Sequence, residues 1–174
     1  MVVLRATQKV LKLLPASAGD APISTTALGD WYVNRIVVDR RPLLLLMSST
    51  SRLPIVTTAR DIKSLPQRLA RILEERLPRL GVSDDCLARE VEAPSVVVVS
   101  KTIDRSVTGQ MVDFAKMLPS YLPELQWDEE DLKFAEDRLA ESPCRASLRF
   151  EDVIFPREAA IQMLESKWRR GLVH

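Results

Sequence analysis

A run of five apolar residues, LLLLM at positions 43–47, limits the folds open to this chain more than any other segment. Because side chains alternate across a strand, such a run presents apolar groups to both faces of a sheet. It therefore predicts a central strand that other elements cover on both sides. The preceding segment 31–38 is rich in aromatic and β-branched residues, and a polar turn separates the two, so together they predict a β-hairpin.

Other segments complete an α+β pattern. Apolar residues predict strands near residues 2–6, 53–58, 95–100 and 153–155, and the valine-rich 95–100 is interpreted as a buried strand. Helical spacing predicts helices over 65–80, 84–92 and 106–118, and further helices that begin near 128 and 156. Ser64 and Gln67 have the spacing of a capping box. We expect a mostly antiparallel sheet of five or six strands, packed with five or six helices.

The composition is that of an ordinary globular domain. The 174 residues include 25 Lys and Arg against 24 Asp and Glu, a net charge of +1, and 46% are hydrophobic. These values exclude a disordered tail, a collagen, a disulfide scaffold and a strongly basic nucleic-acid binder. Neither a linker nor an internal repeat divides the sequence, so we expect a single domain over residues 1–174.

The rare residue types argue against several kinds of chemistry. The one histidine, His174, is the last residue, and histidine-dependent nucleophilic catalysis needs a positioned imidazole. Cys86 and Cys144 lack the spacing of a zinc site and are interpreted as small buried hydrophobes. The five glycines form no phosphate-binding loop. We therefore expect neither a metal nor a cofactor.

The chain carries no pattern of a membrane segment. Its longest apolar run is far shorter than the ~20 residues that a membrane span needs. Basic residues at positions 5, 9 and 12 interrupt the apolar start, so no signal peptide is expected. A cytoplasmic protein with reduced thiols, and without contact to a membrane, is the expectation.

Charge is unevenly spread along the sequence. Residues 1–63 carry nine Lys and Arg against four Asp, whereas residues 124–174 carry eight Lys and Arg against twelve acidic residues. One interpretation is that the two parts attract each other or are merely solvated. The other is a basic surface that binds an anion or nucleic acid.

The junction between the valine-rich strand and the following helix is the strongest candidate site. Helix N-termini that follow strands are common ligand sites, and Lys101 and Arg105 add positive charge there. Asp104 or Ser106 is expected to cap the helix. Gly109 lies inside the helix, where it costs ~1 kcal/mol relative to alanine. This cost indicates close approach by another backbone, by a ring such as Trp31, or by a ligand.

A polar stripe extends this candidate site along the helix. Its members are Arg105, Gly109, Asp113 and Lys116, together with Ser106 and Gln110.

The strand at 31–38 carries a second polar cluster. Tyr32 and Asn34 fall on one side of that strand, together with Asp30, whereas Arg35 falls on the other. Two interpretations remain open. The polar residues could form a structural network in which Arg35 or Arg105 pairs with Asp113 or Asp30. Alternatively, Tyr32, Asn34 and Arg105 could bind a ligand.

Three motifs make the chain resemble an uncharacterised family of small bacterial proteins. They are R-x-T-x-K-x-L at residues 5–11, an L-G-D-W segment ending in asparagine at 28–34, and R-S-V-x-G-x-M-x-D-F at 105–114. The resemblance extends to about residue 122, and the third motif is the most specific. Because the family is one of unknown function, the resemblance implies a shared fold and no activity.

Three functional hypotheses follow. The first is a small bacterial binding or interaction module without catalytic activity, of the kind carried on a mobile element. Its partner would be an unknown protein or a small anionic ligand, and a homodimer is left open. The second is a small-molecule or nucleotide-binding enzyme that uses Lys101, Arg105, Ser106 and Asp113. The third is nucleic-acid binding through the basic N-terminal part, with Trp31 or Tyr32 stacking on bases. The near-neutral net charge disfavours the third.

Overall fold

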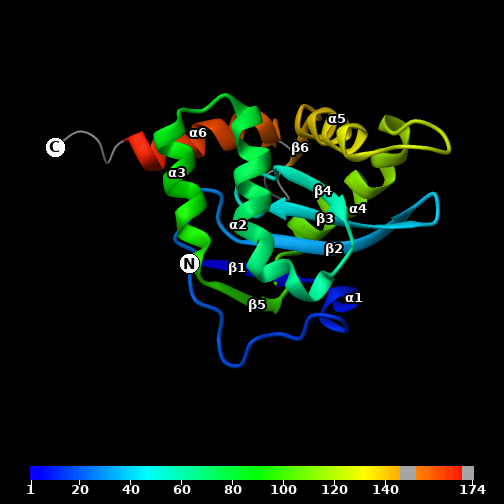
Figure 1. The fold of residues 1–174 in the computed structure, drawn as a ribbon. Helices are drawn as coiled ribbons and strands as arrows, with labels where there is room; N and C mark the ends of the chain where they lie inside the picture. The colour runs from blue at the N-terminus through cyan, green and yellow to red at the C-terminus, as the bar shows by residue number, and fades with distance from the viewer. Residues whose placement is uncertain (146–151, 170–174) are drawn as a thin grey trace.

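A five-stranded sheet forms the centre of the protein in the computed structural model, which describes residues 1–145 and 152–169 (Figure 1). The strands occur in the order β4-β3-β2-β1-β5 and span Val2–Ala6 (β1), Trp31–Val38 (β2), Arg41–Ser48 (β3), Pro54–Thr58 (β4) and Val97–Lys101 (β5). A separate two-stranded sheet pairs Cys144–Arg145 (β6) with Val153–Ile154 (β7).

Six α-helices occur in the described part of the chain. They span Gln8–Leu11 (α1), Leu65–Arg76 (α2), Asp84–Glu92 (α3), Arg105–Met117 (α4), Glu129–Ala140 (α5) and Pro156–Arg169 (α6). The α+β class is therefore confirmed.

The sheet is mixed, so the prediction of a mostly antiparallel sheet was wrong. β1 runs parallel to both of its neighbours, β2 and β5, whereas β3 pairs antiparallel with β2 and β4. The physical reason is the length of the connections. The segment with α1 and the segment with α2 and α3 are both long enough to return the chain to the same end of the sheet, as parallel pairing requires.

Helices cover both faces of the sheet, as the apolar run predicted. Leu44 and Leu46 of β3 lie in one hydrophobic cluster, to which α2, α3 and α6 contribute. Leu43, Leu45 and Met47 lie in a second cluster on the other face, with side chains from α4 and α5. All five side chains are fully buried. Figure 1 shows α2 and α3 on the near side of the sheet.

Local signals were followed in some places and not in others. β4 begins at Pro54 and is an edge strand, as a residue without an N–H group requires. Asp128 caps α5 with a full capping box. Ser64 makes no side-chain cap, because its hydroxyl donates to the carbonyl of Asp61 instead. β5 is an edge strand in which only Val99 is fully buried, so its interpretation as a buried strand was wrong.

A buried carboxylate holds the segment before β2 in place. Glu90 of α3 accepts hydrogen bonds from the backbone N–H groups of Ala27 (2.8 Å) and Leu28 (3.0 Å) and from Nε1 of Trp168 in α6 (2.8 Å). Its side chain is fully withdrawn from solvent. One carboxylate therefore joins the polar loop before β2 to two helices that follow it in the sequence.

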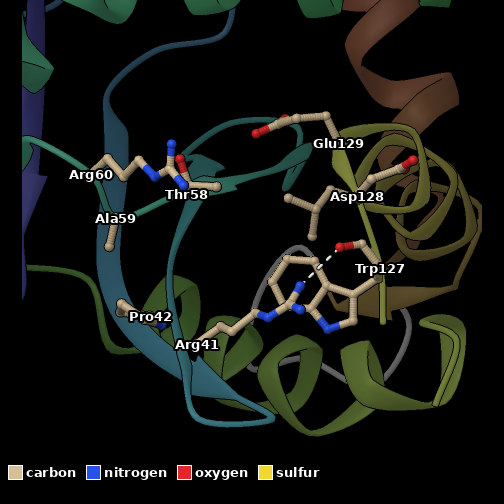
Figure 2. Close-up of a pocket in the computed structure, with 9 residues that line it drawn as sticks. Arg41, Pro42, Thr58, Ala59, Arg60, Trp127, Asp128 and Glu129 are labelled. Atoms are coloured by element: carbon tan, nitrogen blue, oxygen red, sulfur yellow. Dashed lines mark hydrogen bonds between the residues drawn. The ribbon is translucent and has the colours of Figure 1, made fainter. Parts of the chain in front are cut away.

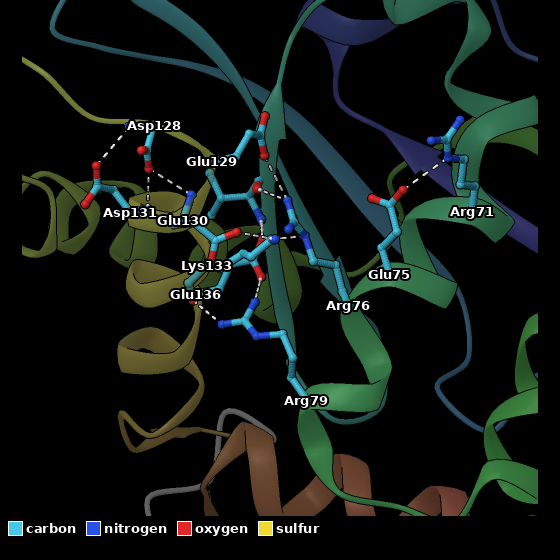
Figure 3. A network of polar contacts seen from close by, with 11 residues as sticks. Arg71, Glu75, Arg76, Arg79, Asp128, Glu129, Glu130, Asp131, Lys133 and Glu136 are labelled. Carbon is cyan, nitrogen blue, oxygen red and sulfur yellow. Dashed lines mark hydrogen bonds and ion pairs between the residues drawn. The ribbon is translucent and has the colours of Figure 1, made fainter.

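The outer edge of β4 is covered by two charged side chains rather than by another strand. The N–H group of Val56 donates to Oε1 of Glu136 (2.8 Å), and its carbonyl accepts from Nη2 of Arg76 (3.5 Å). Glu136 also lies 3.3 Å from Nε of Arg76 and 3.0 Å from Nη1 of Arg79 (Figure 3). These contacts satisfy backbone groups that would otherwise template pairing with another chain.

The charge state of Glu136 is expected to make stability depend on pH. Burial raises the pKa of Glu136 to about 7, although Arg76 and Arg79 oppose that rise. The unfolded chain, with a carboxyl pKa near 4.5, releases this proton at lower pH than the folded protein. The stability that Glu136 contributes is therefore present below pH 4.5 and is lost as the pH rises towards 7. We predict that Glu136→Gln removes this slope.

Chemical denaturation at pH 5, 6, 7 and 8 tests this expectation. The free energy of unfolding of the wild type should fall between pH 5 and 7 by more than that of Glu136→Gln. Glu124→Gln, at an exposed carboxylate, serves as the control and should keep the wild-type slope. Equal slopes for the wild type and Glu136→Gln would contradict the assignment.

Candidate functional site

The start of α4 is fixed to the sheet by Asp104. Its carboxylate accepts hydrogen bonds from the N–H group and from the hydroxyl of Ser106, both at 2.8 Å, so Asp104 is the N-cap. The backbone N–H of Asp104 donates to the hydroxyl of Tyr32 at 3.2 Å. The junction predicted from the sequence therefore contacts the hairpin through Tyr32.

A buried arginine, Arg52, which was not predicted from the sequence, binds this junction through a hydrogen bond to Ser106. Nη2 of Arg52 donates to the hydroxyl of Ser106 at 2.9 Å, and its Nη1 donates to the carbonyl of Ser49. Arg52 adopts a left-handed backbone conformation (φ 63°) in the turn between β3 and β4. Burial lowers the pKa of Arg52, and the nearby carboxylate of Asp104 opposes that change. The only sequence signal was an arginine that ends a run of serine and threonine.

A groove with a volume of about 640 Å³ runs along one face of α4. The helix supplies one wall, and the segment that contains β6 supplies the other. We call it the α4 groove; its lining residues are Ser106, Gly109, Gln110, Asp113, Met117, Pro143, Cys144 and Arg145. The spacing of the helical residues is that of a single face, as the polar stripe predicted.

Gly109 is not explained by packing within the described structure. Apart from its chain neighbours and the backbone of its own helix, a Cβ built at Gly109 would have no atom of residues 1–145 or 152–169 within 4 Å. Trp31 is not its neighbour, because Trp31 packs with α2, α3 and α6 on the opposite face of the sheet. The sequence left open whether another backbone, the Trp31 ring or a ligand comes close to Gly109. Neither another described backbone nor the Trp31 ring does so.

The structure brings together three of the seven predicted site residues. Ser106, Gly109 and Asp113 line the α4 groove. Tyr32 is almost fully buried beneath the junction. The remaining three lie elsewhere; Asn34 accepts from the hydroxyl of Thr7 (2.9 Å), and Lys101 and Arg105 are exposed and do not line the groove.

The expected structural network has a different arginine. Asp30 pairs with Arg5, whose Nε lies 2.8 Å from Oδ2, and not with Arg35 or Arg105. The cause is strand order, because β1 lies between β2 and β5, and Arg5 is in register with Tyr32 and Ser100. Asp113 is exposed on α4 and makes no ion pair with any residue that the structure describes.

The cysteines behave as the sequence interpretation proposed. Both Cys86 and Cys144 are buried and form no disulfide. Burial raises the pKa of the Cys144 thiol to about 11, although the charge of Arg52 opposes that rise. Since the thiolate is the reactive form, a protonated Cys144 is a poor nucleophile and a poor metal ligand at neutral pH. Within the described ranges, no group of three or more candidate ligands could hold a metal ion.

A second cavity, of about 710 Å³, lies at the far end of the β2–β3 hairpin (Figure 2). Arg41 extends beneath the indole of Trp127, with its guanidinium carbon 4.6 Å from the ring centroid. The same guanidinium donates to the carbonyl of Trp127 at 2.9 Å. Arg60 reaches into this cavity from the opposite side. Sequence reasoning did not single out this cavity, because its walls come from segments far apart in the chain.

The chain belongs to an uncharacterised domain family. That family is Domain of unknown function (DUF6933), whose model matches residues 3–159. The resemblance to a family of unknown function is thereby confirmed. Comparison with curated proteins and with solved structures gave no match. In the described part of the chain, every helix is too short or too polar to cross a membrane.

Replacing Gly109 tests whether its small size serves the fold. Because a methyl group at this position enters open space, Gly109→Ala should raise the free energy of unfolding by up to ~1 kcal/mol. That gain corresponds to a rise in Tm of about 2–4 °C for a chain of this size. Thermal unfolding followed by circular dichroism measures it, and Lys116→Ala on the same helix is the control. A fall in Tm would show that the glycine is needed for packing.

Replacing Arg105 separates a surface residue from a structural one. Arg105 is exposed and makes no ion pair with a described residue, so Arg105→Ala should change stability by less than about 0.5 kcal/mol. Arg5→Ala should cost about 3 kcal/mol, because it leaves the largely buried Asp30 without its cation. Denaturant unfolding of both variants measures the difference. A large loss of stability in Arg105→Ala would show that Arg105 belongs to a structural network.

Proposed function

We propose that the chain is a binding module without catalytic activity and that the α4 groove receives its partner. The observation that carries this proposal is Gly109, a helix-interior glycine whose missing side chain leaves the groove floor open. Such a position costs helix stability, and here no described neighbour explains the cost. A partner that lies close to the helix backbone would explain it.

The shape of the groove favours an extended protein segment as the partner. Between Ser106 and Met117 an α-helix rises by about 16 Å, which matches about five residues of extended chain. Ser106, Gln110 and Asp113 offer hydrogen-bonding groups along this length. Arg145 on the opposite wall adds a charge of the other sign. This mixed polar lining suits peptide groups better than it suits a small anion.

The geometry supports the two alternative hypotheses less well. The proposed enzyme needs four side chains to converge, yet Lys101 and Arg105 lie outside the groove that Ser106 and Asp113 line. The hydroxyl of Ser106 already donates to Asp104 and accepts from Arg52. The nucleic-acid hypothesis needed an exposed ring, and Trp31 and Tyr32 are 0% and 2% exposed, so neither can stack on a base.

A cytoplasmic location remains part of this proposal. It rests on the two cysteines, which are buried and unpaired.

Selection of peptides against the intact chain tests the proposed groove. A phage library of random dodecapeptides is selected on the wild type, and each enriched peptide is measured against Gly109→Leu and Asp113→Ala. Leucine is a good helix former whose side chain would fill the groove floor, so it should preserve the fold. Peptides that bind the groove should lose at least tenfold in affinity on Gly109→Leu.

Lys9→Gln, on α1, is the matched surface control and should bind like the wild type. Circular dichroism confirms that each variant is folded. The proposal fails if selection enriches no peptide, or if the enriched peptides bind Gly109→Leu and Asp113→Ala as tightly as they bind the wild type.

A further inference from the structure

Two neighbouring cavities lie at the C-terminal end of β4. The cavity beside Arg41 and a smaller one of about 390 Å³ between β4, α2 and α5 share the lining residues Thr58 and Glu129. We call the two cavities together the β4-end groove. Arg41 and Arg60 line its first part (Figure 2), and Arg68 and Arg71 line its second. The groove therefore collects guanidinium groups from β3, from the end of β4 and from α2.

The carboxylates of this groove are already engaged by other groups (Figure 3). Glu129 pairs with Arg76 at 3.2 Å, and Glu75 pairs with Arg71 at 3.1 Å. Asp128 accepts hydrogen bonds from two backbone N–H groups of α5, at 2.9 and 3.1 Å. Each negative charge therefore has a defined local partner.

Three arginines of the groove lack a carboxylate partner among the described residues. Arg41 is held by the ring and the carbonyl of Trp127. Arg68 donates through Nη2 to the carbonyls of Arg60 (3.0 Å) and Asp61 (3.3 Å), and its buried Nε has no acceptor. Arg60 is exposed and makes no ion pair within residues 1–145 or 152–169. Three arginines against the charge of Asp128, whose partners are neutral N–H groups, leave the groove with an excess of about two positive charges.

From this excess we propose that the β4-end groove binds an oligophosphate group, either inorganic or carried by a nucleotide. Guanidinium groups form bidentate hydrogen bonds with phosphate oxygens, and three of them approach this groove from different elements. A group of two or three linked phosphates carries several negative charges, so it can meet more than one of these guanidinium groups at once. This site is separate from the α4 groove and does not depend on the proposed function.

A nucleic-acid strand fits the groove less well than a compact anion. The Trp127 indole, the aromatic group among the described residues that line this groove, is buried, and the guanidinium of Arg41 covers one of its faces. Base stacking, which supplies much of the affinity for single strands, therefore has no available platform there. The net charge of +1 also gives little long-range attraction for a polyanionic strand.

Isothermal titration of the full chain with sodium tripolyphosphate, in 50 and 200 mM salt, tests the proposal. We expect the affinity for tripolyphosphate to weaken as the salt concentration increases. We also expect it to be at least tenfold lower in the double variant Arg60→Gln/Arg68→Gln. Arg60→Gln alone, at an exposed side chain, should lower the affinity at least threefold. This single variant keeps the test valid if the double variant does not fold. Lys9→Gln/Lys12→Gln, within and directly after α1, removes the same charge elsewhere, and its affinity should stay within twofold of the wild type.

Titrations with ATP and with a twelve-nucleotide single-stranded DNA identify the source of the phosphate. Equal affinity for ATP and tripolyphosphate would assign recognition to the phosphates alone, and tighter binding of ATP would assign it to a nucleotide. The proposal is overturned if tripolyphosphate does not bind at millimolar concentration. It is also overturned if the arginine variants bind as the wild type does, or if only the DNA binds.

Discussion

Burial of β3 from both sides is the constraint on which the rest of the structure depends. Five consecutive apolar side chains need cover on two faces, and a single layer of helices can supply only one. The chain therefore places α2, α3 and α6 on one face and α4 and α5 on the other. With both faces occupied by helices, the outer edge of β4 falls between α2 and α5, within reach of Arg76 and Glu136. The charged cover of that edge thus follows from the apolar strand beside it.

The charged groups of this protein fall into two kinds that differ in how completely they are paired. Glu90 and Glu136 are buried, and each accepts hydrogen bonds from backbone groups as well as from side chains, so they serve the fold. Arg41 and Arg68 of the β4-end groove have carbonyls or a ring, rather than carboxylates, as neighbours. Buried carboxylates with several hydrogen-bond donors therefore join elements of this structure, and the arginines without a carboxylate lie at the surface that we assign to a ligand.

Local sequence patterns predicted those elements whose signals are local. The apolar run identified β3 and the covering of both its faces, and the helical spacing placed Ser106, Gly109 and Asp113 on one wall of a groove. Patterns of this kind carry no information about which strands pair. The parallel position of β1 and the edge position of β5 were therefore missed, and with them the Arg5–Asp30 pair. Arg52 and the wall at residues 143–145 were missed for the same reason, since long-range packing alone brings them to α4. His174 lies outside the described residues.

The three hydrogen bonds to Glu90 have a consequence for the order in which the chain acquires its structure during synthesis. The ribosome makes the loop before β2 early, α3 midway and α6 late, yet one carboxylate joins all three. Likewise, β1 cannot pair with β5 until that strand has been made. Although domains usually fold from their N-terminal end as they emerge, the first thirty residues of this protein complete their contacts only after later segments have been made. A nascent chain that stalls before Trp168 would leave the carboxylate that holds this loop without its third hydrogen bond.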